Sequence, residues 1–210
     1  LRGALSGNSS GLTANILSLA GSIGVGLAGA GSAAASDNDI DNTVAASVVD
    51  AAVTSRDGDI EVLSGSDAKI AALTLGVGAA AGVAVNASIA SNTIGNTVTA
   101  SVSGNSTLDA AADIAIAAED GASVDSLSIS LSGAIGAAVG AVVVSNTVDN
   151  EVKAWLEGSD TDTAMISGAQ DVAIRAHSAV NISGKSLGAA VGLVAAGASL
   201  ASAAAGGSVE

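Results

Sequence analysis

The chain has 210 residues and a formal net charge of −14 at pH 7, from 20 Asp and Glu against 6 Lys and Arg. It contains no Phe, Tyr, Cys or Pro, although 49% of its residues are hydrophobic. The negative charge disfavours binding to nucleic acid or anionic lipid headgroups, and the lack of Cys excludes disulfides and thiolate metal sites. A core of Ala, Val, Ile and Leu favours a thin, regular layer over a globule.

The chain starts at Leu1, which is not an initiator methionine. No basic segment precedes an apolar stretch, as it would in a signal peptide. We therefore expect an internal segment of a longer protein.

A short element recurs along the chain with a period of 54 residues. Residues 36–44 return as 90–98 and as 144–152, and both Asn positions of the element step by 54 each time (92 − 38 and 146 − 92). A second element, 58–62, returns as 112–116 and then, 58 residues later, as 170–174. The four extra residues fall in a polar stretch around Asp160 and Asp162, which we interpret as a loop. Such a period predicts a repeat architecture.

We divide the chain into one repeat array of units at about 12–65, 66–119, 120–177 and a partial 178–210. Each unit carries a tract of Gly, Ala and Val before its Asn pair, and the last unit stops before that pair. The array has no internal domain boundary.

Apolar residues alternate with mostly polar ones after each Asn pair, as in Val44, Ala46 and Val48. This period of two predicts strands with one buried face, separated by turns rich in Gly, Asn, Asp and Ser. The tract from Ala138 to Val144 lacks polar alternates, so both of its faces must be covered, by a second layer, an adjacent domain or another chain.

Membrane helices are the alternative for four charge-free stretches, 12–36, 73–91, 126–148 and 186–208, which reach the length that a bilayer requires. Their high content of Ser, Asn and Gly, and the lack of an aromatic belt, argue against this alternative. We therefore expect no membrane span. The predicted fold is all-β, a β-solenoid of about 54-residue repeats, with a coil of β-hairpins carrying four strands per unit as one candidate form.

The most regular polar residues are the two Asn positions of each unit. If every unit returns to the same angular position, their amides stack along the axis and form hydrogen-bonded ladders. We expect a structural role at a turn. The predicted ladder residues are Asn38, Asn92, Asn146, Asn42, Asn96 and Asn150.

No metal or catalytic site is predicted. Asp37, Asp39 and Asp41 have the spacing that begins an EF-hand loop, but Asn42 and Val48 replace its Gly and Glu. These aspartates, like Asp160 and Asp162, are weak candidates for a divalent ion. His177 aligns with Glu119, and the acids do not cluster with bases, so a polysaccharide-degrading enzyme is the least favoured function. No cofactor is expected.

Trp155 takes the position of Ser47 and Ser101 in the preceding units, on the outward face of its strand. An exposed Trp beside Lys153 can stack on a sugar ring or lie in a contact between chains. A carbohydrate- or host-surface-binding module is therefore the alternative function, and a tolerated surface substitution is the simpler interpretation.

Three elements together resemble the repeat regions of giant bacterial exoproteins of the filamentous haemagglutinin and leukotoxin type. They are Ser-Asn-x-x-x-Asn-x-Val-x-Ala at 91–100 and 145–154, Asp-Ile-x-Ile at 113–116, and the intervening Gly/Ala tract. The resemblance implies a right-handed β-solenoid in a secreted or cell-surface protein, associated with the outer membrane and concerned with attachment. No catalytic residues come with it.

We therefore expect a non-catalytic, structural or adhesive segment that acts as a stiff scaffold or stalk. Expected partners are other domains of the parent chain and a host or neighbouring-cell surface or its glycans. A second copy docked along the Gly/Ala/Val tracts is a further candidate partner.

Overall fold

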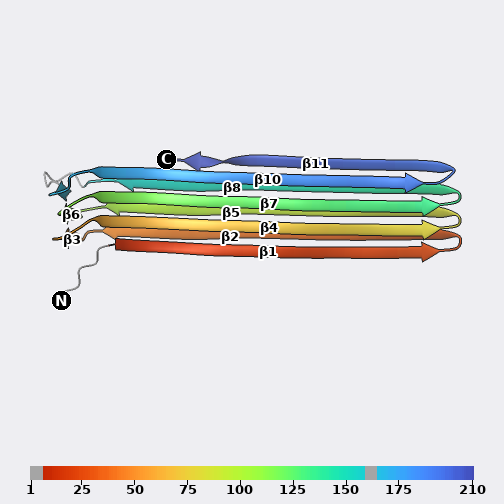
Figure 1. The fold of residues 1–210 in the computed structure, drawn as a ribbon, viewed down its shortest axis with the longest axis horizontal. Helices are drawn as coiled ribbons and strands as arrows, with labels where there is room; N and C mark the ends of the chain where they lie inside the picture. The colour runs from red at the N-terminus through yellow and green to blue at the C-terminus, as the bar shows by residue number, and fades with distance from the viewer. Residues whose placement is uncertain (1–6, 159–164) are drawn as a thin grey trace.

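The computed structural model describes residues 7–158 and 165–210. These residues form eleven β-strands in three sheets, and no helix is found among them. Figure 1 shows two long layers of stacked strands joined by tight turns at one end and by short strands at the other. None of the charge-free stretches within the described ranges forms a helix that could cross a membrane.

Two of the sheets are built from long strands. The first long sheet has the order β1 (Gly7–Gly26), β4 (Ile60–Ala80), β7 (Ile114–Ala134) and β10 (Val172–Val191). The second long sheet has the order β11 (Val194–Val209), β8 (Ala137–Leu156), β5 (Val83–Ser103) and β2 (Gly29–Val49). The short sheet contains β3 (Ala52–Ser55), β6 (Thr107–Ala110) and β9 (Ile166–Ser167). A strand of 21 residues extends over about 70 Å.

Every strand pairs in parallel with its equivalent in the neighbouring unit. Ile60 lies beside Ile114, and Asn38 lies beside Asn92, an offset of 54 residues in both long sheets. The offset grows to 58 between β7 and β10, where Ile114 pairs with Val172. It is 57 between β8 and β11, because Val191 and Val194 are three residues apart whereas their register partners Gly133 and Ala137 are four apart.

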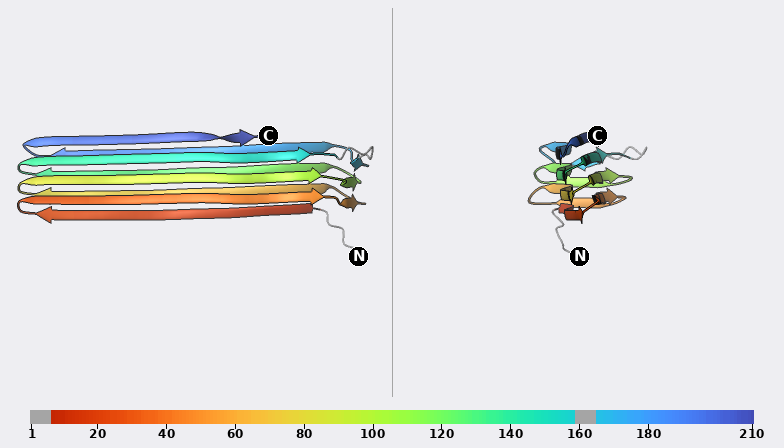
Figure 2. Two further views of the ribbon diagram at one scale, coloured as in Figure 1. Left: turned by 180° about the vertical axis from the view of Figure 1, so that it is seen from behind. Right: turned by 90° about the vertical axis from the view of Figure 1, so that its right-hand side faces the viewer.

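The chain passes once through the three sheets in each unit, along a long strand, back along the second long sheet, and then through a short strand. The end view in Figure 2 shows the two long layers and the short third side. Consecutive strands lie in different sheets, so the described residues form neither hairpin pairs nor four strands per unit, in contrast to one expected form. Parallel pairing with the next unit places like residues side by side, which a hairpin would not do.

The strands are much longer than the sequence pattern predicted, and this corrects the placement of several residues. Asn38 and Asn42 lie within β2 rather than at a turn, and His177 lies within β10. Gly207 in β11 is the one strand glycine with a positive φ angle among the described residues, and the other positive φ angles, at Asp50, Gly104 and Gly168, lie outside the strands. Asn, Ser and Gly favour turns only where their backbone needs a turn conformation.

The interior lies between the two long sheets and is filled by alternate residues of each strand. Its widest apolar cluster packs at the end closed by the short sheet and includes Val62, Val98 and Leu108. A second cluster around Ile70 and Ile94, and a small third one around Val144, follow toward the tight turns. The apolar clusters are separated by buried polar side chains.

Interior side chains become smaller toward the tight turns because the two sheets approach each other there. A Cβ atom built on Gly76 would lie 3.0 Å from the carbonyl oxygen of Ala87 on the opposite sheet. A Cβ on Gly188 would lie 2.6 Å from the carbonyl oxygen of Ala198. This end of the molecule therefore requires glycine or other small residues inside.

The replacement Gly76→Val should destabilise the fold by about 1 to 3 kcal/mol, because its side chain overpacks the narrow interior. Gly133→Val is the matched control, since a Cβ at Gly133 meets nothing within 4 Å and a β-branched residue suits an exposed strand position. Urea unfolding followed by circular dichroism measures both variants. Equal unfolding midpoints would contradict the narrow interior.

Candidate functional site

The most continuous polar feature is a column of asparagine amides inside the second long sheet. The Nδ2 of Asn38 donates to Oδ1 of Asn92 at 2.8 Å, and the Nδ2 of Asn92 donates to Oδ1 of Asn146 at 2.8 Å. Asn146 also donates to Oγ of Ser126 on the opposite sheet at 2.9 Å. All three amides are buried. The column links the units along the stacking direction and ties the two long sheets together.

The other asparagine column, which contains Asn42, Asn96 and Asn150, makes a different set of contacts. Oδ1 of Asn150 accepts a hydrogen bond from the backbone N–H of Asn96 at 3.0 Å. The Nδ2 atoms of Asn96 and Asn150 both point across the interior and donate to the carboxylate of Asp120, at 2.8 Å and 2.5 Å. This column therefore caps a buried acid rather than forming an amide ladder.

Asp120 is the buried ionisable group of this interior, with 3% of its surface exposed. Burial raises the pKa of Asp120 above its ordinary value, and the nearby charge of Asp67 adds to the effect. Hydrogen bonds from Asn96, Asn150 and Ser178 act in the opposite direction and favour the ionised form. The carboxylate is thus held in a low-dielectric position in which protonation is easier than in water.

Sequence reasoning missed Asp120 by treating the acids as turn residues. The signal was present in the alternation of Ile114, Ile116 and Ala118, because one further step of two reaches Asp120 on the same inward face. The equivalent positions in the neighbouring units are Ser66 and Ser178. One unit therefore carries a carboxyl group where its neighbours carry a hydroxyl group.

Hydroxyl groups form a further buried layer closer to the tight turns. Thr74, Ser88 and Ser128 are joined by three hydrogen bonds of 2.5 to 2.8 Å between their side-chain oxygens. Next to them, Nδ2 of Asn86 donates to the backbone oxygen of Leu131 at 2.6 Å, and its Oδ1 accepts from Ser32 at 2.7 Å. These bonds join three successive units.

A column of aspartates was also not assigned a role by the sequence pattern. Asp59, Asp113 and Asp171 come directly before β4, β7 and β10, three of the four strands of the first long sheet. Oδ1 of Asp59 accepts from the backbone N–H of Asp113 at 2.9 Å, and Oδ1 of Asp113 accepts from that of Asp171 at 3.2 Å. Each carboxylate therefore satisfies a backbone donor of the next unit, which explains the recurring Asp-led element.

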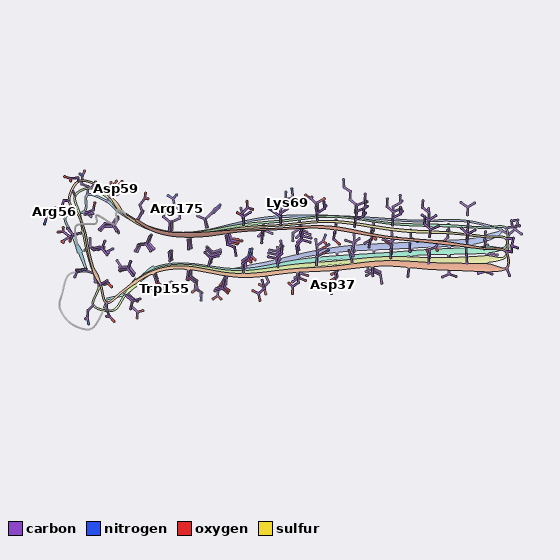
Figure 3. The ribbon with its side chains drawn as sticks, turned by 90° about the horizontal axis from the view of Figure 1, so that it is seen from below. Asp37, Arg56, Asp59, Lys69, Trp155 and Arg175 are labelled. Carbon is purple, nitrogen blue, oxygen red and sulfur yellow. The ribbon has the colours of Figure 1, made fainter. Side chains whose placement is uncertain are left out.

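Trp155 lies on the outer face of the second long sheet, in register with Ser101 (Figure 3). Its side chain is half-buried, with 37% exposed. Nearby on the same strand face, Nζ of Lys153 contacts Glu151 at 2.5 Å and Glu210 at 3.4 Å. These two carboxylates raise the pKa of Lys153. The Trp surface is therefore flat, partly apolar and bordered by paired charges.

The weak metal candidates Asp37, Asp39 and Asp41 all point outward from β2, as alternate residues of a strand must. Asp39 and Asp41 line a shallow recess of about 600 Å³ together with Asp149 and Glu151. Within the described ranges, no group of three or more His, Asp or Glu side chains is placed to hold a metal ion. Asp160 and Asp162 lie outside the described residues.

His177 and Glu119 lie side by side on neighbouring strands of the first long sheet, both outward-facing. They line a shallow surface recess with Asp67 and Gly121. The recess is open to solvent on the flat face of the sheet. The side chains of Asp67, Glu119 and His177 give it a polar, acidic surface in the half of the sheet nearer the short strands.

Comparison of the chain with protein-family models, with curated proteins and with solved structures gives no match. The arguments for function therefore come from the chain itself.

Asn92→Ala should lower the free energy of unfolding by about 1 to 3 kcal/mol, because it leaves the Nδ2 of Asn38 and the Oδ1 of Asn146 without that partner in the interior. Ser91→Ala, at the adjacent outward position, is the matched control and should change it little. Urea unfolding measures both. An Asn92 variant as stable as the control would show that the amide column does not stabilise the stack.

Asp120→Asn should become more stable relative to the wild type as the pH rises. A raised pKa means that the folded state binds the Asp120 proton more tightly than the unfolded chain does. Wild-type stability from this group is therefore highest below the unfolded pKa of about 4 and falls as the pH rises through the folded pKa. The Asn side chain cannot ionise, so the variant does not lose stability at this position as the pH rises.

Thermal unfolding of both proteins between about pH 3.5 and 7 tests this difference. The variant Asp120→Ser, which introduces the residue found at Ser66 and Ser178, should show the same trend. A stability difference that stays constant or shrinks with rising pH would contradict the assigned pKa direction.

Proposed function

We propose that the chain is a β-solenoid segment of a large secreted or cell-surface bacterial protein, and that it serves as a stiff, non-catalytic scaffold in attachment. The observation that carries the proposal is the register, in which each strand pairs with its equivalent in the next unit. A stack of this kind lengthens by one layer for every repeat without changing its cross-section.

One buried and one exposed polar column support a mechanical role. Side-chain hydrogen bonds of the Asn38 column and the Asp59 column run along the stacking direction, in addition to the backbone bonds of the sheets. A shift of one unit along its neighbour by one residue would turn these polar groups out of alignment and expose the apolar face. The interior thus fixes the register of every layer.

The reach of such a scaffold depends on the number of repeats. Each unit adds about 4.8 Å along the stacking direction, whereas the long strands extend over about 70 Å across it. The described units therefore form a broad slab, and a long repeat region would form a fibre with the same broad cross-section. This shape suits a spacer that carries binding regions elsewhere.

Location and partners follow from the same proposal. The repeat elements that resemble those of bacterial exoproteins support a place outside the cell. Other domains of the parent chain and a host or neighbouring-cell surface are the proposed partners.

The scaffold proposal predicts that an inserted copy of the 54-residue unit 66–119 is accommodated as one more layer. Small-angle X-ray scattering should show a cross-section unchanged in width and about 5 Å thicker along the stack. The unfolding midpoint should also rise, because the insertion adds one interface between units.

An inserted half unit, residues 66–92, is the control. It breaks the register and should lower stability or disrupt the fold. Equal tolerance of the whole and the half unit would sink the scaffold proposal.

A second candidate function, binding of carbohydrate or a host surface, is favoured by the partly exposed indole of Trp155 beside Lys153. Aromatic faces stack on sugar rings. Trp155→Ser introduces the residue found in register at Ser101, so the fold should be retained while any glycan binding falls at least tenfold. Binding on a glycan array that is absent, or unchanged in this variant, would remove this function.

A further inference from the structure

The half of the slab next to the tight turns is apolar on both outer faces. Residues 70–108 and 126–148 contain no Asp, Glu, Lys or Arg. The outward positions of the two middle units in this half define an apolar band, which Figure 3 shows as side chains projecting from both long sheets near the turns. The band consists of Leu73, Leu75, Val77, Ala79, Val83, Val85, Ala87, Ile89, Leu127, Ile129, Leu131, Gly133, Ala137, Val139, Ala141 and Val143.

The band is exposed even in the units that have neighbours on both sides. Leu75 is 36% exposed, Val85 50% and Val139 40%. The same columns continue into the flanking strands β1, β2, β10 and β11, where Lys185 is the one charged residue among their register partners. Neither long sheet is covered there by other described residues. Such a surface is unusual for a protein that stays alone in water.

Charged groups occupy the opposite half of the same faces. Asp67, Lys69 and Glu119 lie outward on the first long sheet, and Asp149 and Glu151 lie outward on the second. The net charge of −14 is therefore concentrated away from the apolar band. Two copies that faced each other along their full length and pointed in the same direction would bring these acidic halves together. Like-charge repulsion disfavours that arrangement.

The area of one face of the band reaches the size of a specific contact. With a strand rise of about 3.3 Å and a strand spacing of about 4.8 Å, each outward residue covers about 30 Å². Four outward columns across the four strands of a long sheet give about 500 Å² per copy, or about 1,000 Å² per contact, which is the lower limit for specific association. Contacts at this lower limit are weak, so we expect a dissociation constant of about micromolar order.

The surface relief of the band suits a protein sheet as the partner. On the second long sheet, Ala33, Ala87, Ala141 and Ala198 form one column of small residues. The column forms a groove between a ridge containing Val85 and Val139 and a ridge containing Ile89 and Val143. Ridges and grooves of this kind interdigitate when two sheets pack face to face.

We propose that the apolar band docks a second copy of this chain, like face on like face, with the apolar ends overlapping and the acidic ends pointing in opposite directions. A twofold axis through the contact satisfies this arrangement, as in most self-complementary interfaces. Because both faces carry a band, each copy binds two others and the chains associate laterally. The inference goes beyond the scaffold function, which requires only stacking of units within one chain.

Sedimentation velocity of the full 210-residue chain at about 1 to 100 µM tests the proposal. The wild type should increase in mass beyond a dimer with rising concentration. Leu75→Glu with Leu131→Glu removes the band of the first long sheet, and Val85→Glu with Val143→Glu removes that of the second. Each pair should stop association at the dimer, and all four substitutions together should give a monomer.

The matched control is Ala117→Glu with Ser123→Glu, which adds the same charge to outward positions beside Arg175 and Lys69 in the polar half. It should associate as the wild type does. Far-UV circular dichroism establishes that each variant is folded, and serine replaces glutamate in any that is not. A folded wild type that stays monomeric at all these concentrations would overturn the proposal, as would a control that dissociates like the band variants.

Binding of lipid to the apolar band would give a different result from self-association. In that case, the wild type would remain monomeric in buffer and would float with vesicles of neutral phosphatidylcholine. Lateral association is also separable from the scaffold function, because a monomeric wild type that still accepts a whole inserted unit would reject the inference and retain the scaffold.

Discussion

The structure depends on parallel pairing of each strand with the same strand of the next unit, in register. This pairing places Asn92 between Asn38 and Asn146, and Ile114 beside Ile60. A buried amide is costly unless both its donor and its acceptor are satisfied. In the Asn38 column, stacked copies of one residue satisfy each other, so these buried amides are stable because the neighbouring unit carries the same side chain. The repeat in the sequence and the pairing in the structure therefore require one another.

The thin interior follows from the same pairing. Long strands run through positions that would otherwise favour turns, because neighbours on both sides satisfy their backbone groups. The two long sheets then approach so closely near the tight turns that Gly76 and Gly188 leave no space for a side chain. Larger apolar residues such as Leu108, Ile70 and Ile94 fill the interior farther from these turns. The molecule therefore has a wide, charged end and a narrow, apolar end.

Much of this architecture could be predicted from the sequence. The alternation after each Asn pair indicated strands, and the all-β class with parallel strands in stacked sheets is found in the structure. The sequence pattern placed the Asn residues at turns and missed the length of the strands. A local run of Asn, Ser and Gly looks the same in the sequence whether it forms a turn or part of a stacked strand. Only the contacts with the next unit distinguish the strand from the turn.

The interior site was harder to predict than the fold. The sequence pattern assigned no role to Asp120, although its parity with Ile116 and Ala118 places it inside. The burial of Asp120 was hard to predict because its hydrogen-bond partners, Asn96 and Asn150, are 24 and 30 residues away in the chain. Similarly, hydrogen bonds of the Asp59 column join residues 54 and 58 apart. Pairing across units supplies these contacts, and a local pattern cannot.

Cysteine cross-linking tests the in-register pairing most directly, because the chain has no Cys of its own. Ser91 and Ser145 are register partners on the outer face of the second long sheet. With Cα atoms about 5 Å apart, a Ser91→Cys and Ser145→Cys pair should form a disulfide within one chain under mild oxidation. The offset pair Ser91→Cys and Asp149→Cys lies at least about 13 Å apart and should not. Cross-linking of the offset pair in preference to the register pair would contradict the stacked arrangement.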